Sequence, residues 1–429
     1  MKAGRAPTRD TIAPMASVRH WVLLFAVFGA FITYLDRVCI AVAAPLMQAD
    51  LKLSQYEMGW VFTAFYVAYG IFEMPSSWLG DRWGQRRTLT RIVGGWSVFT
   101  ILTGAARGYG SLLAVRFLFG AAESGAFPTL SRALSRWFPA YERGFANGMM
   151  WTGARLGGAV SPALAVLAIG WMGWRGAFVL FGAIGLIWVA VCAVWYRDDP
   201  GDHPRVSKRE LEVIRVGAAP APLKTQALPW KKLLFNRDLL ILCATYLASG
   251  FGFQFFVTWL PTYLTREHGL TLARSGFYTA LPLLAGAAGC ALGGFVSDSI
   301  TRRTGSLLWG RRIVGAGGFL LGAAGFFAAV QARSPELAVA CLAFASGTHD
   351  MSLPVLWATC TDLGGRFGGT AGGWLNLASS ISGMLAPVVS AGLADVFGSF
   401  NAVFWVTTSL YLAGAMLWLI IDPRKPAIT

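Results

Sequence analysis

Long apolar stretches dominate this chain of 429 residues. A helix that crosses the hydrocarbon core of a bilayer needs about 20 predominantly apolar residues. Only 13% of the residues are charged, against about 25% in a typical soluble domain. We therefore expect an all-α polytopic membrane protein with twelve transmembrane helices. They are predicted at about 21–46, 57–79, 88–107, 110–137, 144–170, 175–196, 238–264, 272–297, 311–331, 336–360, 367–395 and 400–421.

The basic residues are unevenly distributed between the two sides of the membrane. If the N-terminus lies in the cytoplasm, most of the 36 Lys and Arg fall in segments on that side. This is the positive-inside bias of membrane proteins, and it places both termini in the cytoplasm. Because topology explains the net charge of +15, we expect the lipid bilayer as a partner and no nucleic acid.

Landmark residues recur across one long hydrophilic segment, which divides six spans from six. Pro45 matches Pro261 at an offset of 216 (261 − 45), and Asp81 matches Asp298 at 217 (298 − 81). Two pseudo-symmetric six-helix halves around a central site are typical of rocking transporters. The predicted organisation is a basic tail at 1–19, halves at 20–196 and 237–422, a cytoplasmic linker at 197–236 and a tail at 423–429.

Charged residues of both signs interrupt the apolar spans. A charge at the centre of a spanning helix costs about 2.5 kcal/mol or more, so its presence indicates a function. Arg116 and Glu123 are seven residues apart and share one helix face. Arg116 is suited to grip a carboxylate through two hydrogen bonds, and Glu123 to take up a proton and sense whether an anion occupies the arginine. The structural alternative is a permanent Arg–Glu bridge that locks two helices together.

Asp36 and Arg37 form a second charged position, in the first span. Adjacent residues point about 100° apart on a helix, so the two side chains can face different neighbours. We assign Arg37 to the substrate anion and Asp36 to the proton. A structural salt bridge is again the alternative.

Several motifs resemble a known family. The segment SWLGDRWGQRR, from Ser77 to Arg87, resembles the loop signature between helices 2 and 3 of the major facilitator superfamily. Other segments are similar to its anion:cation symporter family: YLDR at 34–37, RFLFGAAESGAFP at 116–128, WFPAYER at 137–143 and GGWLN at 372–376. The resemblance implies the major facilitator fold and import of organic anions with protons, by a monomer in a bacterial cytoplasmic membrane.

The same resemblance implies further site residues. Tyr34 and Tyr69 match family positions near the substrate, and Asn376 matches a position where an amide reads substrate hydroxyls. Trp374 lies two residues before Asn376, where it would either wall the pocket or pack between helices.

Arg155 departs from the family pattern, in which a polar amide often stands one residue earlier, where this chain has Ala154. It is either a third positive contact, for a substrate with a second acidic or strongly polar end, or the partner of an internal acid. The candidate acids are Glu73, Glu123 and Asp350.

His349 and Asp350 lie together in the tenth span. At an offset of 226 (349 − 123), His349 is the counterpart of Glu123, which would make a proton relay. Alternatively, His349 and Asp350 form an internal pair. Both are candidate proton-coupling residues.

The loops carry residues that we assign to conformational gating. Asp81 is placed to hold a helix N-terminus or a basic residue, and Asp298 is its copy in the second half. Arg82 and Arg86 are expected to pair with acidic groups across the cytoplasmic face. Such contacts would latch one conformation and release in the other.

These observations predict a secondary active transporter that imports a small organic anion with protons by alternating access. A proton-coupled exporter is the alternative, but Ser161, and not the glycine of the antiporter signature, precedes Pro162. A membrane receptor or sensor would need a signalling domain, for which the linker leaves no room. The sequence contains no metal-ligand spacing and no nucleophile–base pairing, so we expect no enzyme, no metal and no cofactor apart from the coupled protons.

Overall fold

The computed structural model of the protein describes residues 17–216, 233–270 and 272–424. Within these ranges all regular secondary structure is helical, which confirms the all-α prediction. The predicted tails at 1–19 and 423–429 and the linker at 197–236 lie partly outside the described residues.

The first half consists of α1 to α6. Its fourth pass is broken into α4 and α5, and its fifth and sixth passes are two parts of α6 that meet at Gly173, where the backbone is not helical (φ 71°, ψ 171°). The helices are α1 (Val18–Leu51), α2 (Gln55–Trp83), α3 (Gln85–Gly104), α4 (Tyr109–Glu123), α5 (Ala126–Trp137) and α6 (Arg143–Trp195). In the linker, Ser207 caps the short helix α7 (Lys208–Arg215) by accepting from the Glu210 N–H at 3.1 Å.

The second half consists of α9 to α16. Its first pass is divided into α9 and α10, and its fourth into α13 and α14. The helices are α9 (Arg237–Thr258), α10 (Leu260–Arg266), α11 (Leu272–Thr304), α12 (Leu307–Val330), α13 (Pro335–Asp350), α14 (Ser352–Gly364), α15 (Gly368–Phe397) and α16 (Asn401–Ile420). Together with the first half this makes twelve passes in the described residues, as predicted.

Length and apolar composition alone identify seven segments of the described residues that could cross a membrane. Two of them, 140–195 and 335–394, are long enough for two passes. The helices α2 and α3 fall outside this set because polar and charged residues interrupt them. Examples are GDRW at 80–83, at the end of α2, and TRIV at 90–93, near the start of α3.

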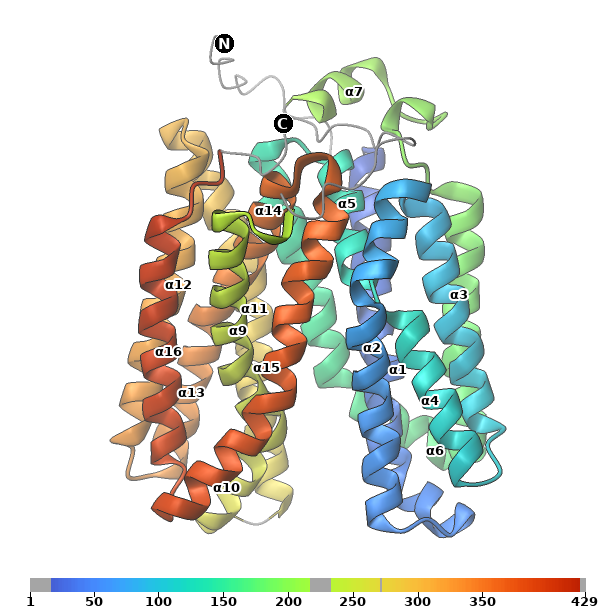
Figure 1. Ribbon diagram of the computed structural model, residues 1–429, viewed down its shortest axis with the longest axis vertical. Coiled ribbons are helices and arrows are strands. Elements are labelled where there is room, and N and C mark those ends of the chain that lie inside the picture. Colours follow the sequence, from blue (N-terminus) through green and yellow to red (C-terminus); the bar gives the residue numbers. More distant parts are fainter. Residues whose placement is uncertain (1–16, 217–232, 271, 425–429) are drawn as a thin grey trace.

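Two helix pairs form the largest contacts between the halves. The helix α6 packs against α11, and α2 packs against α15. In Figure 1, α5, α7 and α14 lie at one end of the molecule and α10 lies at the other. We call the first the linker end and the second the far end. Residues in the middle of α1, α2, α4, α6 and α15 are thus brought to the centre of the bundle.

Candidate functional site

A break in the fourth pass places Glu123 at the end of α4. Two residues later, Gly125 has a φ of 79°, a left-handed conformation that favours glycine. A Cβ at this position would lie 2.7 Å from the Cβ of Ser76, so the close approach of α2 also requires glycine. The freed N–H of Gly125 donates to Glu73 of α2 at 3.2 Å. The bend therefore ties Glu73 of α2 to the backbone just after Glu123.

Glu123 is paired with Arg37 of α1. Arg37 Nε donates to Glu123 Oε1 at 3.1 Å, and Nη2 donates to the same oxygen. The Arg37 side chain is 20% exposed, whereas Glu123 is fully buried and its Oε2 has no hydrogen-bond partner. The structural alternative, an Arg–Glu bridge between two helices, is therefore present, and it joins Arg37 of α1 to Glu123 of α4 and not Arg116 to Glu123 or Asp36 to Arg37. Glu123 faces a guanidinium from another helix, which its spacing within α4 does not reveal.

Arg116 is buried without a bound carboxylate. It is 2% exposed, and it forms no ion pair within 4.0 Å and no hydrogen bond among the described residues. Its guanidinium lies over Phe119 at 4.3 Å and over Phe65 at 5.4 Å. The acids that act on it electrostatically are Glu123 and Asp36. A guanidinium in this situation is arranged to receive an anion from outside the chain.

Asp36 is buried within electrostatic reach of Arg116. It is 1% exposed, and neither of its carboxylate oxygens has a hydrogen-bond partner of good geometry. The indole of Trp96 on α3 is near it but also makes no such bond. An ionised carboxylate is costly in these surroundings, so the position suits a group that carries a proton in part of a cycle.

Aromatic rings surround the Arg37 guanidinium. Tyr34, Phe65 and Tyr69 lie 5.4, 5.1 and 5.0 Å from it. Tyr66 is 44% exposed although it lies eleven residues (66 − 55), or about 16 Å, into α2, a depth near the middle of a bilayer. Tyr66 also interacts electrostatically with Arg37, so it belongs to the same charged and aromatic cluster.

Asn376 of α15 connects the second half to this cluster. Its Nδ2 donates to Tyr69 Oη and to Glu73 Oε1, each at 2.9 Å. Glu73 is fully buried. Trp374 packs partly buried against the core, and its indole N–H is buried without a hydrogen-bond partner. The amide of Asn376 therefore lies within reach of the first-half charges, as a substrate contact would.

A second central ion pair also crosses between the halves. Arg155 of α6 donates from Nε to Asp350 Oδ2 at 2.8 Å and from Nη2 to Oδ1 at 3.1 Å. The Arg155 guanidinium lies 3.8 Å from the centre of the Phe253 ring on α9. Of the two interpretations of Arg155, the structure has the internal partner, and the partner is Asp350.

His349 belongs to this second pair. Its Nδ1 lies 3.4 Å from Asp350 Oδ1, and its ring stacks on Tyr411 at 4.3 Å. The ring of Phe319 meets it edge-on at 4.8 Å. No contact in the described part of the chain links His349 to Glu123, so the geometry is that of the internal pair and not of a direct relay.

Two aspartates close the linker end in matching ways. Asp81 on α2 accepts from the backbone N–H of Thr370 at 2.6 Å, in the first turn of α15. Asp298 on α11 accepts from the N–H of Phe145 at 2.6 Å, in the first turn of α6. Each carboxylate thus holds the N-terminus of a helix from the other half, where free N–H groups and the helix dipole favour an anion.

The basic partners at this end were not identified from the sequence, although a basic residue was one expectation for Asp81. Arg132 lies 3.6 Å from Asp81, and Arg311 lies 3.2 Å from Asp298. Arg143 of the first half pairs with Asp362 of the second. The WFPAYER motif contains Arg143, but its partner lies 219 residues away and has no motif of its own.

Among the described residues, neither Arg82 nor Arg86 forms an ion pair with an acid across the linker end, so that expectation is wrong. The Arg82 guanidinium lies over Trp78 at 5.3 Å. The Arg86 side chain donates to the Ala193 carbonyl, and its backbone N–H donates to Asp198 at 2.7 Å. Burial raises the pKa of the Asp198 carboxyl, and the Arg86 N–H partly offsets this rise. Both arginines therefore make contacts within the first half.

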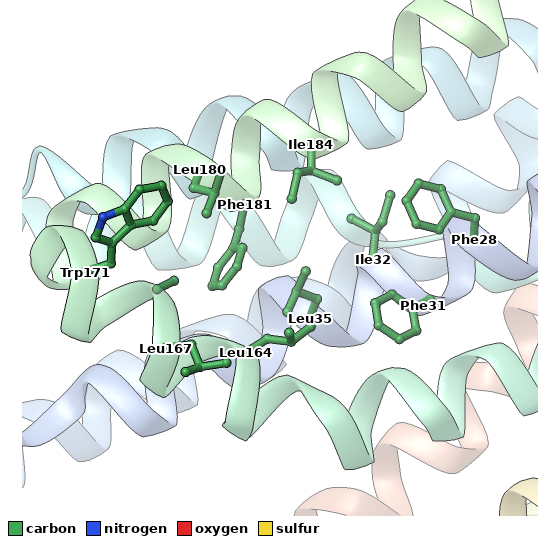
Figure 2. A pocket seen from close by; sticks show the side chains of 11 residues that line it. Phe28, Phe31, Ile32, Leu35, Leu164, Leu167, Trp171, Leu180, Phe181 and Ile184 are labelled. Atoms are coloured by element: carbon green, nitrogen blue, oxygen red, sulfur yellow. The ribbon is translucent and has the colours of Figure 1, made fainter.

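A groove of about 350 Å³ on the outer surface is separate from the charged cluster. It lies between α1 and α6, and Figure 2 shows Ile32, Leu35, Leu164 and Phe181 among its apolar lining. Since no charged side chain lines it, the groove suits the acyl chains of lipids and not an anion.

Comparison with known proteins gives concordant results. Residues 26–387 match the Major Facilitator Superfamily. A probable sulfoacetate transporter of Cupriavidus necator is 37% identical, covering 94% of each chain. A D-galactonate transporter of Escherichia coli is 32% identical, covering 94% of this chain and 95% of that one. The solved structure of a proton:xylose symporter superposes with a TM-score of 0.75 at 15% identity, over 95% of this chain and 96% of that chain, which is a likeness of fold.

Proposed function

The chain belongs to the major facilitator superfamily, and on this premise we propose that it imports a small organic anion together with protons by alternating access. Two relatives similar over almost the whole chain are named for the transport of sulfoacetate and of D-galactonate, both organic acids. We assign a cargo of the same chemical class to this chain. Its linker end would face the cytoplasm, as the positive-inside bias predicts.

The observation that carries this proposal is the state of Arg116. A buried guanidinium has lost its water, and Arg116 lies over the rings of Phe65 and Phe119 without a hydrogen-bonded carboxylate among the described residues. A chain that used Arg116 for structure would supply a carboxylate within hydrogen-bonding distance, as it does for Arg37. A substrate carboxylate or sulfonate provides the missing charge and accepts the guanidinium's parallel hydrogen bonds.

Protons enter through Asp36 and Glu123. Arg37 neutralises Glu123, but an anion arriving beside Arg37 and Arg116 competes for the same guanidinium groups. Protonation of the two acids removes that competition, so protons and anion favour each other's binding. Coupling then requires only that both bias the same equilibrium between two conformations.

Closure at one end supports alternating access. Among the described residues, the hydrogen bonds that join the halves lie at the linker end or near the middle, and none lies at the far end. This is the pattern of a state that admits substrate from the far end. Release on the other side would break the contacts of Asp81 and Asp298 with the opposite half.

Uptake by proteoliposomes tests the proposal. Radiolabelled sulfoacetate and D-galactonate are offered with an inward proton gradient, with the gradient collapsed by a protonophore, and with the gradient reversed. We expect accumulation only with the inward gradient. Binding of neither anion, or accumulation unchanged by the protonophore, would contradict proton-coupled import, and accumulation driven only by the reversed gradient would identify an exporter.

A further inference from the structure

The two broken fourth passes each have a first segment that ends on an acidic residue. The first-half break follows Glu123, the last residue of α4, and the second-half break follows Asp350, the last residue of α13. Each acid is bound by an arginine from another helix, Arg37 for Glu123 and Arg155 for Asp350. Only the second pair joins the two halves. The bundle therefore holds two similar guanidinium–carboxylate units near its centre.

The two guanidinium groups have one tyrosine, Tyr34, as a common neighbour. Arg37 lies 5.4 Å from the Tyr34 ring, and Arg155 interacts electrostatically with the same residue. The helix of Arg155 approaches Tyr34 closely, since a Cβ at Gly158 would lie 3.3 Å from the ring atom Cδ1. Both cationic positions therefore lie near the same ring, so the two ends of one small molecule can reach them together.

We propose that Asp350 is a built-in counter-ion, which the second negative group of a dianionic substrate displaces from Arg155. The chain then selects organic dianions over monoanions of the same size. This inference rests on the proposed function, because it assumes that the first negative group binds at Arg116 and Arg37.

One charge balance and two contacts make the exchange of Asp350 for a substrate anion feasible. The substrate's anion replaces the Asp350 carboxylate, so Arg155 stays neutralised and no unpaired charge is created. Phe253, at 3.8 Å, holds the guanidinium in place while its partner changes. His349 Nδ1, 3.4 Å from Asp350 Oδ1, remains as a neighbour for the released carboxylate.

The displacement also changes how the halves are joined. The Arg155–Asp350 pair connects α6 to α13, so a substrate that binds Arg155 removes a direct contact between the halves. A monoanion leaves the pair intact. Recognition of the second charge is thereby linked to the motion that transport requires.

Matched pairs of anions test the proposal on the full-length protein. Sulfoacetate is compared with methylsulfonylacetate, in which a methyl group replaces one sulfonate oxygen and removes one charge. Galactarate is compared with D-galactonate, in which a hydroxymethyl group replaces one carboxylate. Affinities are measured by calorimetry in detergent and by competition for uptake. The wild-type protein should bind each dianion at least about tenfold more tightly than its partner, the lower end for a charge-assisted hydrogen bond.

Two substitutions should act in opposite directions. Arg155→Ala should lower the affinity for dianions at least about tenfold while changing that for monoanions less than about threefold. Asp350→Asn should raise the affinity for dianions, because nothing then competes for Arg155. The double variant R155A/D350N, which has no unpaired charge at this position, should fold and bind both members of each pair equally.

A purely structural bridge gives another pattern. If Arg155→Ala and Asp350→Asn both weaken all four anions alike, or if the wild type does not prefer dianions, the counter-ion proposal is overturned. Proton-coupled uptake of the monoanions would persist in that case and leave the proposed function intact. Failure of the wild type to bind any of the four overturns both.

Discussion

The two halves are built alike at the linker end and differently at the centre. At the linker end Asp81 and Asp298, one from each half, hold the first turn of a helix in the opposite half. At the centre the first half contributes Arg37, Arg116 and Glu123, to which the second half adds no cation among the described residues. The symmetry has been kept where the halves move against each other.

The linker end serves the conformational change, whereas the centre serves anion binding. In alternating access one repeat rocks against the other around a fixed site, and Asp81 and Asp298 give one matching contact from each half. Binding an anion requires cations on one side of a hollow and groups that read the rest of the molecule on the other. The amide of Asn376 and the acid Asp350 are what the second half supplies.

The largest effect is expected from removing the first-half cation that has no carboxylate partner. Arg116→Ala should reduce anion affinity by more than about 100-fold, since two charge-assisted hydrogen bonds are lost. Calorimetry and uptake with sulfoacetate measure it. The matched control is Arg107→Ala, at an exposed site before α4, which should bind normally. If Arg116→Ala keeps its affinity for sulfoacetate, Arg116 is not the anion receptor.

A second effect should separate binding from coupling. Glu123→Gln keeps the shape of the side chain but cannot lose a proton, so exchange of substrate across the bilayer should persist. Accumulation driven by the proton gradient should fall to the equilibrium level. Counterflow and gradient-driven uptake in the same proteoliposomes measure the two activities, with Glu57→Gln at the exposed start of α2 as control. Undiminished accumulation would exclude Glu123 as an essential proton carrier.

Helix count, composition of the halves and charged positions follow from the sequence, because they depend on hydropathy and on residues within one span. Pairings do not. Glu123 shares a face with Arg116, yet its partner is Arg37, 86 residues away. The same holds for Arg155, whose choice among three acids depends on how α6 meets α13.

For Asp81, too, the sequence indicated the kind of contact but not the partner. Asp81 was expected to hold a helix N-terminus or a basic residue, and the carboxylate contacts both Thr370 and Arg132. Nothing near Asp81 in the sequence indicates that the helix is α15. Arg82 and Arg86 belong to the same motif, but their charges are satisfied locally, by a tryptophan ring and a carbonyl group.

Because Asp81 and Asp298 make matching contacts, we call them the latch aspartates and expect their substitution to slow transport to a similar extent. Asp81→Asn and Asp298→Asn each weaken one carboxylate contact with a helix N-terminus, so each should reduce the turnover of uptake several-fold while leaving anion affinity unchanged. Initial uptake rates and binding affinities measure the two quantities. Asp50→Asn, which alters an exposed ion pair with Arg175 in the first half, is the control. A large effect from one latch aspartate and none from the other would break the symmetry at this end.

The smallest effect concerns the glycine that bends the first-half helix. Gly125→Ala places a Cβ 2.7 Å from that of Ser76 and forces alanine into a left-handed conformation. Gly305 has a similar φ of 67° with nothing within 4 Å, so Gly305→Ala in the second half incurs only the backbone cost, about 1–2 kcal/mol. Gly125→Ala should cost about 1–3 kcal/mol more, from overpacking. Thermal unfolding in detergent compares the two, and equal losses would show that α2 and the bend can separate without cost.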